Sequence, residues 1–248
     1  MFLKDYSLEE IEKIFGIHAC ISVLNNQNRE ISKILCTKDV LKKIQAKVNN
    51  QKILKNIRIL KRQDLDTQLK TTIHQGIVVY TKKKKILQLQ SIIKKQKRIL
   101  ILDSLNDSQN VGSIIRSAFL FGIKCIFFNE KKSFSINPIL IKAASGAYEN
   151  INLIPVTNII NLVKTLKKNN FWILGLEASA KKKISEIDKS LKIAIILGSE
   201  NKGMRKLVKE SCDFTAKIPI LENERNVDSL NVSNAASIVF YELSRYEN

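Results

Sequence analysis

Three short segments of the sequence combine small residues with side chains that can hold a charge or a polar ligand. They span residues 102–118, 197–204 and 229–236. Each lies where an apolar, strand-like run gives way to a helical pattern, and in an open α/β sheet that is where ligands bind. The side chains of interest are Asn110 and Arg116 in the first segment, Glu200 in the second, and Ser229 and Asn231 in the third.

The chemistry open to these side chains is the positioning and stabilisation of negative charge. Arg116 is the only cation of its predicted helix, and a guanidinium stays protonated, so charge stabilisation suits it better than proton abstraction. Glu200 can hold either Arg116 or the Asn110 amide through a charge-assisted hydrogen bond. Ser229 and Asn231 can contact a ligand, although both residue types are also preferred helix N-caps.

Other kinds of ligand site are disfavoured. None of the eight glycines forms a G-x-G pair, which argues against a dinucleotide-binding turn and against a glycine-rich methyltransferase loop. Gly198 and Gly203 have P-loop spacing, but Met204 and Arg205 follow where Lys and Ser or Thr are required. The four cysteines form no C-x-x-C pair and there are two histidines, so we expect buried, inert thiols and no metal site.

Taken in order, the three segments resemble the signature motifs of the SpoU/TrmH branch of the SPOUT methyltransferases. The motifs are N-x-G-x-x-x-R from Asn110, G-x-E-x-x-G from Gly198, and S-L-N-V-S-x-A-A from Ser229. The resemblance covers about residues 98–246. It implies an enzyme that transfers a methyl group from S-adenosylmethionine to an RNA ribose 2′-hydroxyl, working as a homodimer of trefoil-knotted α/β domains. By resemblance Arg116 is the main catalytic residue, contacting the target phosphate and ribose; Asn110, Glu200, Ser229 and Asn231 complete the catalytic set.

The same resemblance implies a cofactor site made by three loops at strand ends. Its glycines would let backbone amides approach the cofactor closely, and its aliphatic side chains would contact the adenine ring. The sequence departs from the family pattern between Pro219 and Ser229, where the connection is longer than usual and lacks its glycine. The expected cofactor-binding residues are Gly175, Leu176, Leu197, Gly198, Ile218 and Leu230.

The N-terminal part adds a second resemblance. Residues 16–19 (G-I-H-A) and 72–77 (T-I-H-Q-G-I) are similar to the substrate-binding domain of the ribosomal-RNA guanosine 2′-O-methyltransferases, which has an L30e-like α/β fold. His18 is either a core histidine or a functional one, and His74 with Gln75 is better explained as a turn that fixes the domain. The expected organisation is an RNA substrate-binding domain at 1–81, a basic linker at 82–97 and a methyltransferase domain at 98–248.

Periodicity predicts an α/β protein with a parallel sheet in its second domain. Near-continuous apolar runs such as 193–197 are typical of parallel strands buried on both faces. At the N-terminus, Ser7 and Glu10 form a capping-box pattern, and with Gly16 as C-cap they predict a helix over 7–15. Strands are expected at 31–35, 57–60, 77–80, 99–102, 124–128, 151–156, 171–176, 193–197 and 214–218, and helices at 19–24, 40–48, 64–69, 111–121, 138–144, 159–167, 204–210 and 230–245.

The net charge and the N-terminal residues indicate which classes of partner and which cellular location to expect. The 42 Lys and Arg against 23 Asp and Glu give a net charge of +19, which favours RNA as the partner, although a Lys-, Asn- and Ile-rich composition accounts for part of the excess. The acidic start and the lack of an eighteen-residue apolar run indicate a cytoplasmic protein without a membrane span. The leading function is methylation of a guanosine in 23S ribosomal RNA; a transfer-RNA methyltransferase and a non-catalytic RNA-binding assembly factor are the alternatives, and no DNA partner is expected.

Overall fold

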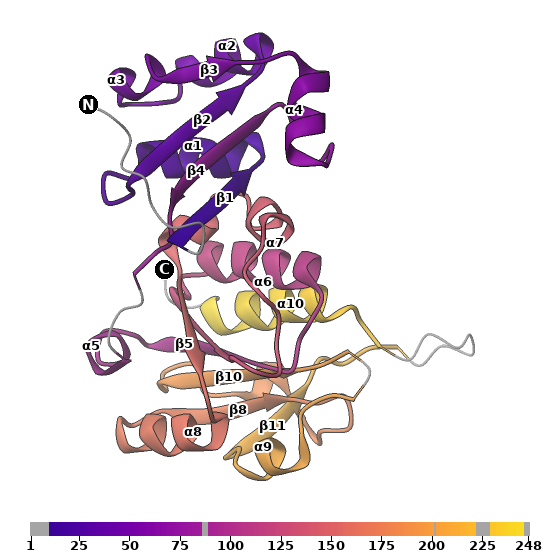
Figure 1. Cartoon of the computed structure of the whole chain (residues 1–248). Coiled ribbons are helices and arrows are strands. Elements are labelled where there is room, and N and C mark those ends of the chain that lie inside the picture. The colour runs from indigo at the N-terminus through magenta and orange to yellow at the C-terminus, as the bar shows by residue number, and fades with distance from the viewer. Residues whose placement is uncertain (1–9, 86–88, 201, 222–228, 246–248) are drawn as a thin grey trace. The chain divides into compact units, whose positions relative to one another are not determined.

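The chain folds into two compact units (Figure 1). In the computed structural model, unit 1 comprises residues 1–85 and 136–150, and unit 2 comprises residues 86–135 and 151–248. The segment 136–150 falls inside the second domain expected from the sequence, yet it packs as part of unit 1. The structure describes residues 10–85, 89–200, 202–221 and 229–245.

Unit 1 is built on a four-stranded sheet in the order β1-β4-β2-β3. Strand β4 is antiparallel to both its neighbours, and β2 runs parallel to β3. Phe15, Leu35 and Val78 lie side by side in register and form a buried cluster with Leu65 of helix α4. The elements are β1 (Ile11–Phe15), α1 (Ile17–Asn25), β2 (Ile31–Cys36), α2 (Lys38–Gln45), α3 (Gln51–Leu54), β3 (Ile57–Ile59), α4 (Arg62–Leu69), β4 (Ile77–Lys82), α7 (Pro138–Ala143) and the 3-10 turn η2 (Ala147–Asn150).

The predicted helix over residues 7–15 is wrong. Residues 11–15 form strand β1, whose register pairs Ile14 with Val79 and Phe15 with Val78. The capping-box residue Ser7 lies outside the described residues. Gly16 ends no helix: its φ of 88° turns the chain from β1 into α1. Pairing with a strand more than sixty residues later in the chain overrides the local helix signal, because propensity is a weak prior against tertiary contacts.

His74 and Gln75 hold the turn before β4, as predicted from the sequence. The Gly76 amide donates to His74 Nδ1 over 3.0 Å, so Nε2 carries the ring proton and donates to Asp66 Oδ1 over 2.6 Å. Gln75 accepts a hydrogen bond from the Ile17 amide with its side-chain oxygen. His74 is buried and holds the turn, whereas His18 is exposed and is not a core residue.

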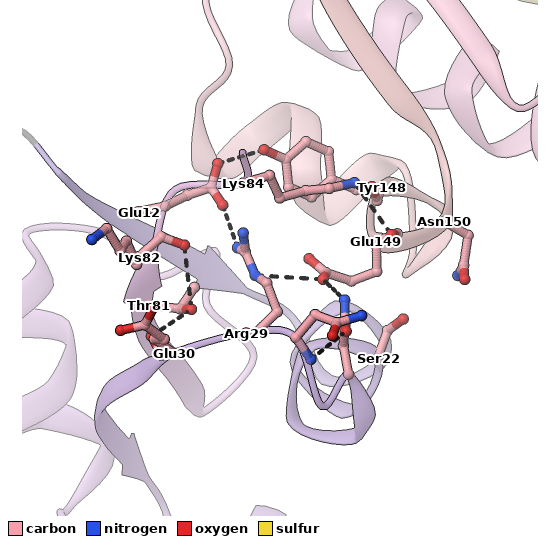
Figure 2. A network of polar contacts seen from close by, with 12 residues as sticks. Glu12, Ser22, Arg29, Glu30, Thr81, Lys82, Lys84, Tyr148, Glu149 and Asn150 are labelled. Carbon is pink, nitrogen blue, oxygen red and sulfur yellow. Dashed lines mark hydrogen bonds and ion pairs between the residues drawn. The ribbon is translucent and has the colours of Figure 1, made fainter. Parts of the chain in front are cut away.

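A buried polar network ties the segment 136–150 to the rest of unit 1 (Figure 2). Arg29 bonds Glu12 over 2.5 Å and lies 3.5 Å from a Glu149 oxygen, and its side chain is only 4% exposed. The Tyr148 hydroxyl donates to the other Glu12 oxygen, and Lys84 Nζ donates to the Tyr148 carbonyl. Burial lowers the pKa of Lys84, an effect that Glu149 opposes, while burial and then Glu12 raise the pKa of Tyr148. Two carboxylates thus balance two cations.

Unit 2 is built on a seven-stranded sheet in the order β7-β6-β5-β10-β8-β11-β9. Every strand pair is parallel, which confirms the predicted α/β fold with a parallel sheet. The strands are β5 (Arg98–Asp103), β6 (Cys125–Asn129), β7 (Asn152–Val156), β8 (Trp172–Leu176), β9 (Lys182–Lys183), β10 (Ile193–Gly198) and β11 (Phe214–Lys217).

Helices cover both faces of this sheet. Phe127, Ile173 and Ile196 of the sheet pack against Leu162 of α8 and Val208 of α9. Helices α6 and α10 pack together on the opposite face (Figure 1). Among the described residues, no helix is both long and apolar enough to cross a membrane. The remaining elements are α5 (Leu89–Ile93), α6 (Ser108–Leu120), α8 (Ile159–Lys168), the 3-10 turn η3 (Ile184–Glu186), α9 (Lys206–Glu210) and α10 (Val232–Ser244).

The four cysteines are free thiols. Cys20, Cys36 and Cys125 are buried, and Cys212 is half-buried. Burial raises the pKa of the Cys36 thiol to about 11 and that of Cys125 to about 12. These thiols therefore stay protonated near neutral pH and are poor nucleophiles.

Candidate active site

The predicted site residues of unit 2 gather at the carboxyl ends of its central strands. Asn110 lies in the first turn of α6, which follows β5; Asp107 caps this helix by accepting from the Asn110 amide over 2.6 Å. Glu200 lies in the loop after β10. Asn231 is the N-cap of α10, and its side-chain oxygen accepts from the Ser233 amide over 2.9 Å. Parallel strands bring the starts of both helices to one edge of the sheet.

Asn110, Glu200 and Asn231 form a closed hydrogen-bonded cluster, called here the Asn–Glu–Asn cluster. The Asn110 amide donates to Glu200 Oε1. Asn231 Nδ2 donates to Asn110 Oδ1 over 3.1 Å and lies 3.4 Å from Glu200 Oε1. Asn231 thus does two things at once, since its oxygen caps a helix while its nitrogen holds the cluster.

Arg116 is not part of this cluster. It lies six residues beyond Asn110 on α6, which places it about 9 Å further along the axis and on a different side of the helix. Its side chain is exposed, and within the described part of the chain it makes no hydrogen bond or ion pair. Of the two partners considered for Glu200, the structure selects the Asn110 amide.

A buried ion pair supports the loop that carries Glu200, and the sequence reasoning missed it. Asp103, the last residue of β5, is fully buried. It accepts from Arg205 Nε over 2.7 Å and from the Arg205 amide over 3.0 Å. An acidic residue directly after the apolar run 99–102 was the available signal, because a buried carboxylate needs a partner. The pair fixes the end of β5 to the end of the 199–205 loop.

A cavity of about 370 Å³ lies where the cofactor was expected. The expected residues Leu176, Leu197, Gly198, Ile218 and Leu230 line it, as does Ser229. The volume falls in the range of small-molecule sites. Residues 222–228, which form most of the unusually long connection, lie outside the described residues. Glu177 and Ile220, which belong to the expected cofactor loops, line it too. Side chains not expected at the cavity also line it: Glu200, Lys202, Lys217 and Val232.

Two glycines are required by protein packing. Gly175 does not line the cavity: a Cβ there would lie 2.6 Å from Met204 Cε and 2.9 Å from the Cys212 sulfur. At Gly198 a Cβ would lie 2.2 Å from the backbone of Gly203 and Met204. The loop closes back there through a bridge between Ser199 and Gly203. Packing against protein atoms thus gives both positions a reason to be glycine, and Gly198 also lines the cavity.

A second cavity, of about 460 Å³, adjoins the first. Ser104 and Asn110 line it from the β5 side. Ser199, Glu200 and Lys202 line both cavities. Glu200 therefore lies on the boundary between the two cavities. The first cavity is formed mainly at the ends of β8, β10 and β11, and the second at the end of β5.

Two family models match the sequence. The SpoU rRNA Methylase family matches residues 97–241, and the family described as RNA 2′-O ribose methyltransferase substrate binding matches residues 13–87. The 23S rRNA (guanosine-2′-O-)-methyltransferase RlmB of Coxiella burnetii is 37% identical, with 96% of this chain and 97% of that protein covered. A putative TrmH family tRNA/rRNA methyltransferase of Staphylococcus saprophyticus is 34% identical, with 97% and 98% covered.

Solved structures share the fold. The SpoU methyltransferase AviRb of Streptomyces viridochromogenes, in complex with AdoMet, superposes with a TM-score of 0.77 at 18% identity, over 99% of this chain and 95% of that one. The A. aeolicus TrmH/SpoU tRNA modifying enzyme gives a TM-score of 0.54 at 22% identity, over 63% and 81%.

The fold is an open parallel α/β sheet with two adjoining cavities at its carboxyl edge, which is where proteins of this class bind their ligands. The motifs, the two family models and the full-length relatives identify the particular group. The chain belongs to the SpoU rRNA methylase family.

Proposed function

We propose that this protein transfers a methyl group from S-adenosylmethionine to the ribose 2′-hydroxyl of a guanosine in 23S ribosomal RNA. The observation that carries the proposal is the pair of adjoining cavities that share Glu200. A methyl donor in one and a nucleotide in the other would meet at that shared wall. The 23S rRNA relative, similar over nearly the whole chain, supports the choice of substrate.

The first cavity suits S-adenosylmethionine. Leu197, Ile218 and Leu230 offer aliphatic surface for an adenine ring, and Glu177 and Glu200 offer carboxylates for the positive charges of the amino acid and sulfonium groups. When bound, the cofactor supplies an activated methyl group. The chain's own part is to hold the two ligands in line and to exclude water.

In this proposal Arg116 and the Asn–Glu–Asn cluster have different functions in methyl transfer. Arg116 is exposed and free to bind the target phosphate and to stabilise the negative charge that develops on the ribose oxygen. The cluster holds Asn110 and Glu200 at the boundary of the two cavities, where they orient the ribose. Ser229 lies on the cofactor side.

Replacing Gly198 by alanine tests the cofactor cavity. The added Cβ would collide with the backbone of Gly203 and Met204, so the 199–203 loop must move. We expect a loss of about 1–3 kcal/mol of stability and at least a tenfold loss of S-adenosylmethionine affinity by calorimetry. The control is Gly122→Ala, which has a positive φ but no atom within 4 Å of its Cβ; it should lose stability and keep its affinity. Equal affinities in the two variants would contradict the assignment.

Replacing Asn231 by serine separates its two functions. Serine is an effective N-cap but cannot reach Asn110 and Glu200 as the amide does. We expect an unchanged melting temperature, within about 2 °C, and a turnover about 10- to 100-fold lower. Asn231→Ala should lose both stability and turnover. Wild-type turnover in Asn231→Ser would confine this residue to helix capping.

Unit 1 serves the RNA in this proposal. We propose residues 1–81 as the RNA substrate-binding domain and 98–248 as the methyltransferase domain, apart from the segment 136–150, which packs in unit 1. The predicted basic linker at 82–97 includes helix α5, whose Ile92 and Ile93 are buried in the unit 2 core. The substrate-binding family model over residues 13–87 supports the first assignment.

We further propose that the protein is a cytoplasmic homodimer whose methyltransferase domain forms the family's knot. The exposed side chains of Leu120 on α6, and of Ile238 and Tyr241 on α10, support an association surface. Phe121 and Tyr241 pack edge to face and join these two helices into one surface. Arg116 is one turn from Leu120, so a second copy bound there would lie close to it. Sedimentation analysis of the full chain tests the dimer.

The decisive experiment is methyl transfer from labelled S-adenosylmethionine to unmodified 23S ribosomal RNA and, separately, to transfer RNA, followed by nucleoside analysis. We expect 2′-O-methylguanosine from ribosomal RNA alone. Label only in transfer RNA would overturn the substrate. No transfer to either RNA and no cofactor binding would favour a non-catalytic RNA-binding factor.

A further inference from the structure

A third cavity, of about 390 Å³, lies on the same edge of the unit 2 sheet, at the ends of β6 and β7. It is called here the β6–β7 cavity. Two loops and the starts of helices α8 and α9 form it. Its lining residues are Asn129, Lys131, Lys132, Thr157, Asn158, Ile159, Ile160, Arg205, Lys206, Leu207 and Val208.

Asn129 builds the cavity by joining its two loops. This side chain is 95% buried, with 5% of its surface exposed. Its oxygen accepts hydrogen bonds from the amides of Lys131 and Lys132 over 3.1 and 2.9 Å. Its nitrogen donates to the Thr157 carbonyl over 3.3 Å. The two lysines are therefore carried by a loop that a buried side chain holds in place.

The rim of the β6–β7 cavity is strongly basic. Lys131, Lys132 and Lys206 are exposed, and none of them forms an ion pair within the described residues. Arg205 is held by Asp103 and is electrically balanced. The lining described above contains no acidic side chain. Three unpaired cations around one hollow create a positive potential that favours an anionic ligand.

The interior of the cavity is apolar. Leu207 lies in the first turn of α9 with 69% of its surface exposed. Ile159, Ile160 and Val208 line the same space. An apolar floor with a polar rim marks a binding site more often than a plain solvated surface. A nucleotide has a flat apolar base and an anionic phosphate. The aliphatic floor of the cavity suits the base, and its cationic rim suits the phosphate.

The β6–β7 cavity is connected to the reaction site. Arg205 lines the β6–β7 cavity and forms an ion pair with Asp103. Ser104, which follows Asp103 in the chain, lines the cavity proposed for the target ribose. Strands β5, β6 and β7 are neighbours in the sheet, so the two cavities follow one another along its edge. An RNA strand entering one could continue into the other.

We propose that the β6–β7 cavity binds a nucleotide of the substrate RNA that flanks the methylated one. Its phosphates contact Lys131, Lys132 and Lys206, and its base packs on Leu207. This inference rests on the proposed function, because it assumes that RNA occupies the neighbouring cavity. Phosphate contacts give affinity and register without sequence information, so the cavity sets how firmly the RNA is held and leaves the chemical step alone.

The test compares two triple variants of the full chain that remove equal charge. The cavity variant is K131A/K132A/K206A. The control variant is K124A/K164A/K168A, whose lysines are also exposed and lie before β6 or on the body of α8, away from the cavity. Binding of unmodified 23S ribosomal RNA is measured by filter retention at several salt concentrations. S-adenosylmethionine affinity and the kcat and KM of methyl transfer are measured alongside.

We expect the cavity variant to bind RNA roughly 10- to 50-fold more weakly near 0.15 M salt, and the slope of log affinity against log salt to fall by about 2, as the loss of three single-strand phosphate contacts implies. KM for RNA should rise, whereas kcat and cofactor affinity should stay within about twofold of wild type. The separate variant Leu207→Ser should weaken binding about three- to tenfold through lost apolar contact, with the salt slope unchanged.

Equal RNA affinity in the cavity and control variants would overturn the inference and point to another anionic ligand, such as an acidic protein segment. A fall in kcat at saturating RNA would also overturn it, because the cavity would then act in the chemical step. Wild-type protein that binds RNA but transfers no methyl group would refute the proposed function, a result distinct from either of these.

Discussion

Arg116→Ala is expected to lower kcat for methyl transfer by about 10²- to 10³-fold, the loss typical of removing one donor that stabilises a developing oxyanion. A ribose hydroxyl is a weak nucleophile, and a fixed positive charge beside it lowers the free energy of the transition state more than that of the bound substrate. Arg116 is exposed and has no partner within the described residues, so its loss should leave the fold unchanged. Single-turnover methylation of ribosomal RNA measures the effect.

The controls separate catalysis from binding. Gln109→Ala removes another exposed side chain of α6 and should retain wild-type turnover. Arg116→Lys keeps the charge but loses the planar fork of donors, and we expect an intermediate rate. RNA and cofactor affinities should stay within a few-fold of wild type in all three variants. Wild-type turnover in Arg116→Ala would refute the role proposed for this residue.

The second large effect is expected on stability, from Arg29→Ala. Its side chain is 4% exposed and lies between Glu12 and Glu149, which are themselves 9% and 4% exposed (Figure 2). Removing the cation leaves two buried carboxylates short of a partner, and breaking a buried ion pair in this way costs about 3–5 kcal/mol. Urea unfolding measures the loss, and hydrogen exchange of residues 11–36 should show that it falls on unit 1.

An exposed ion pair supplies the comparison. Lys167 and Asp213 lie 2.6 Å apart, with side chains 40% and 22% exposed, so Lys167→Ala should cost less than about 1 kcal/mol. Arg29→Lys keeps the charge and should lie between the two. If Arg29→Ala were as stable as Lys167→Ala, the network would not contribute to holding the segment 136–150 in unit 1.

The elements of unit 2 could be predicted because their signals are local. An apolar run such as 193–197 is long enough for a buried strand and too short for most helices, and the structure has a strand there. Helix α6 was expected from residue 111, and it begins three residues earlier, at Ser108 after its cap Asp107. Strand β1 could not be predicted in this way. Its partner β4 lies far along the chain, and the local signal favoured a helix.

The candidate site likewise has features that the sequence predicted and features that depend on contacts between distant segments. The sequence by itself determined which side chains reach the carboxyl edge of the sheet, since polar residues that end apolar strands must meet there in a parallel sheet. Only the tertiary structure decided that Glu200 meets Asn110 and Asn231, which are 90 and 31 residues away from it, and not Arg116. Spacing along the chain carries no information about strand order, and strand order is what brings β5, β10 and the start of α10 together. The tertiary structure also decided that Gly175 makes room for Met204 and that residues 136–150 belong to unit 1. Both features depend on packing between segments that are distant in the sequence.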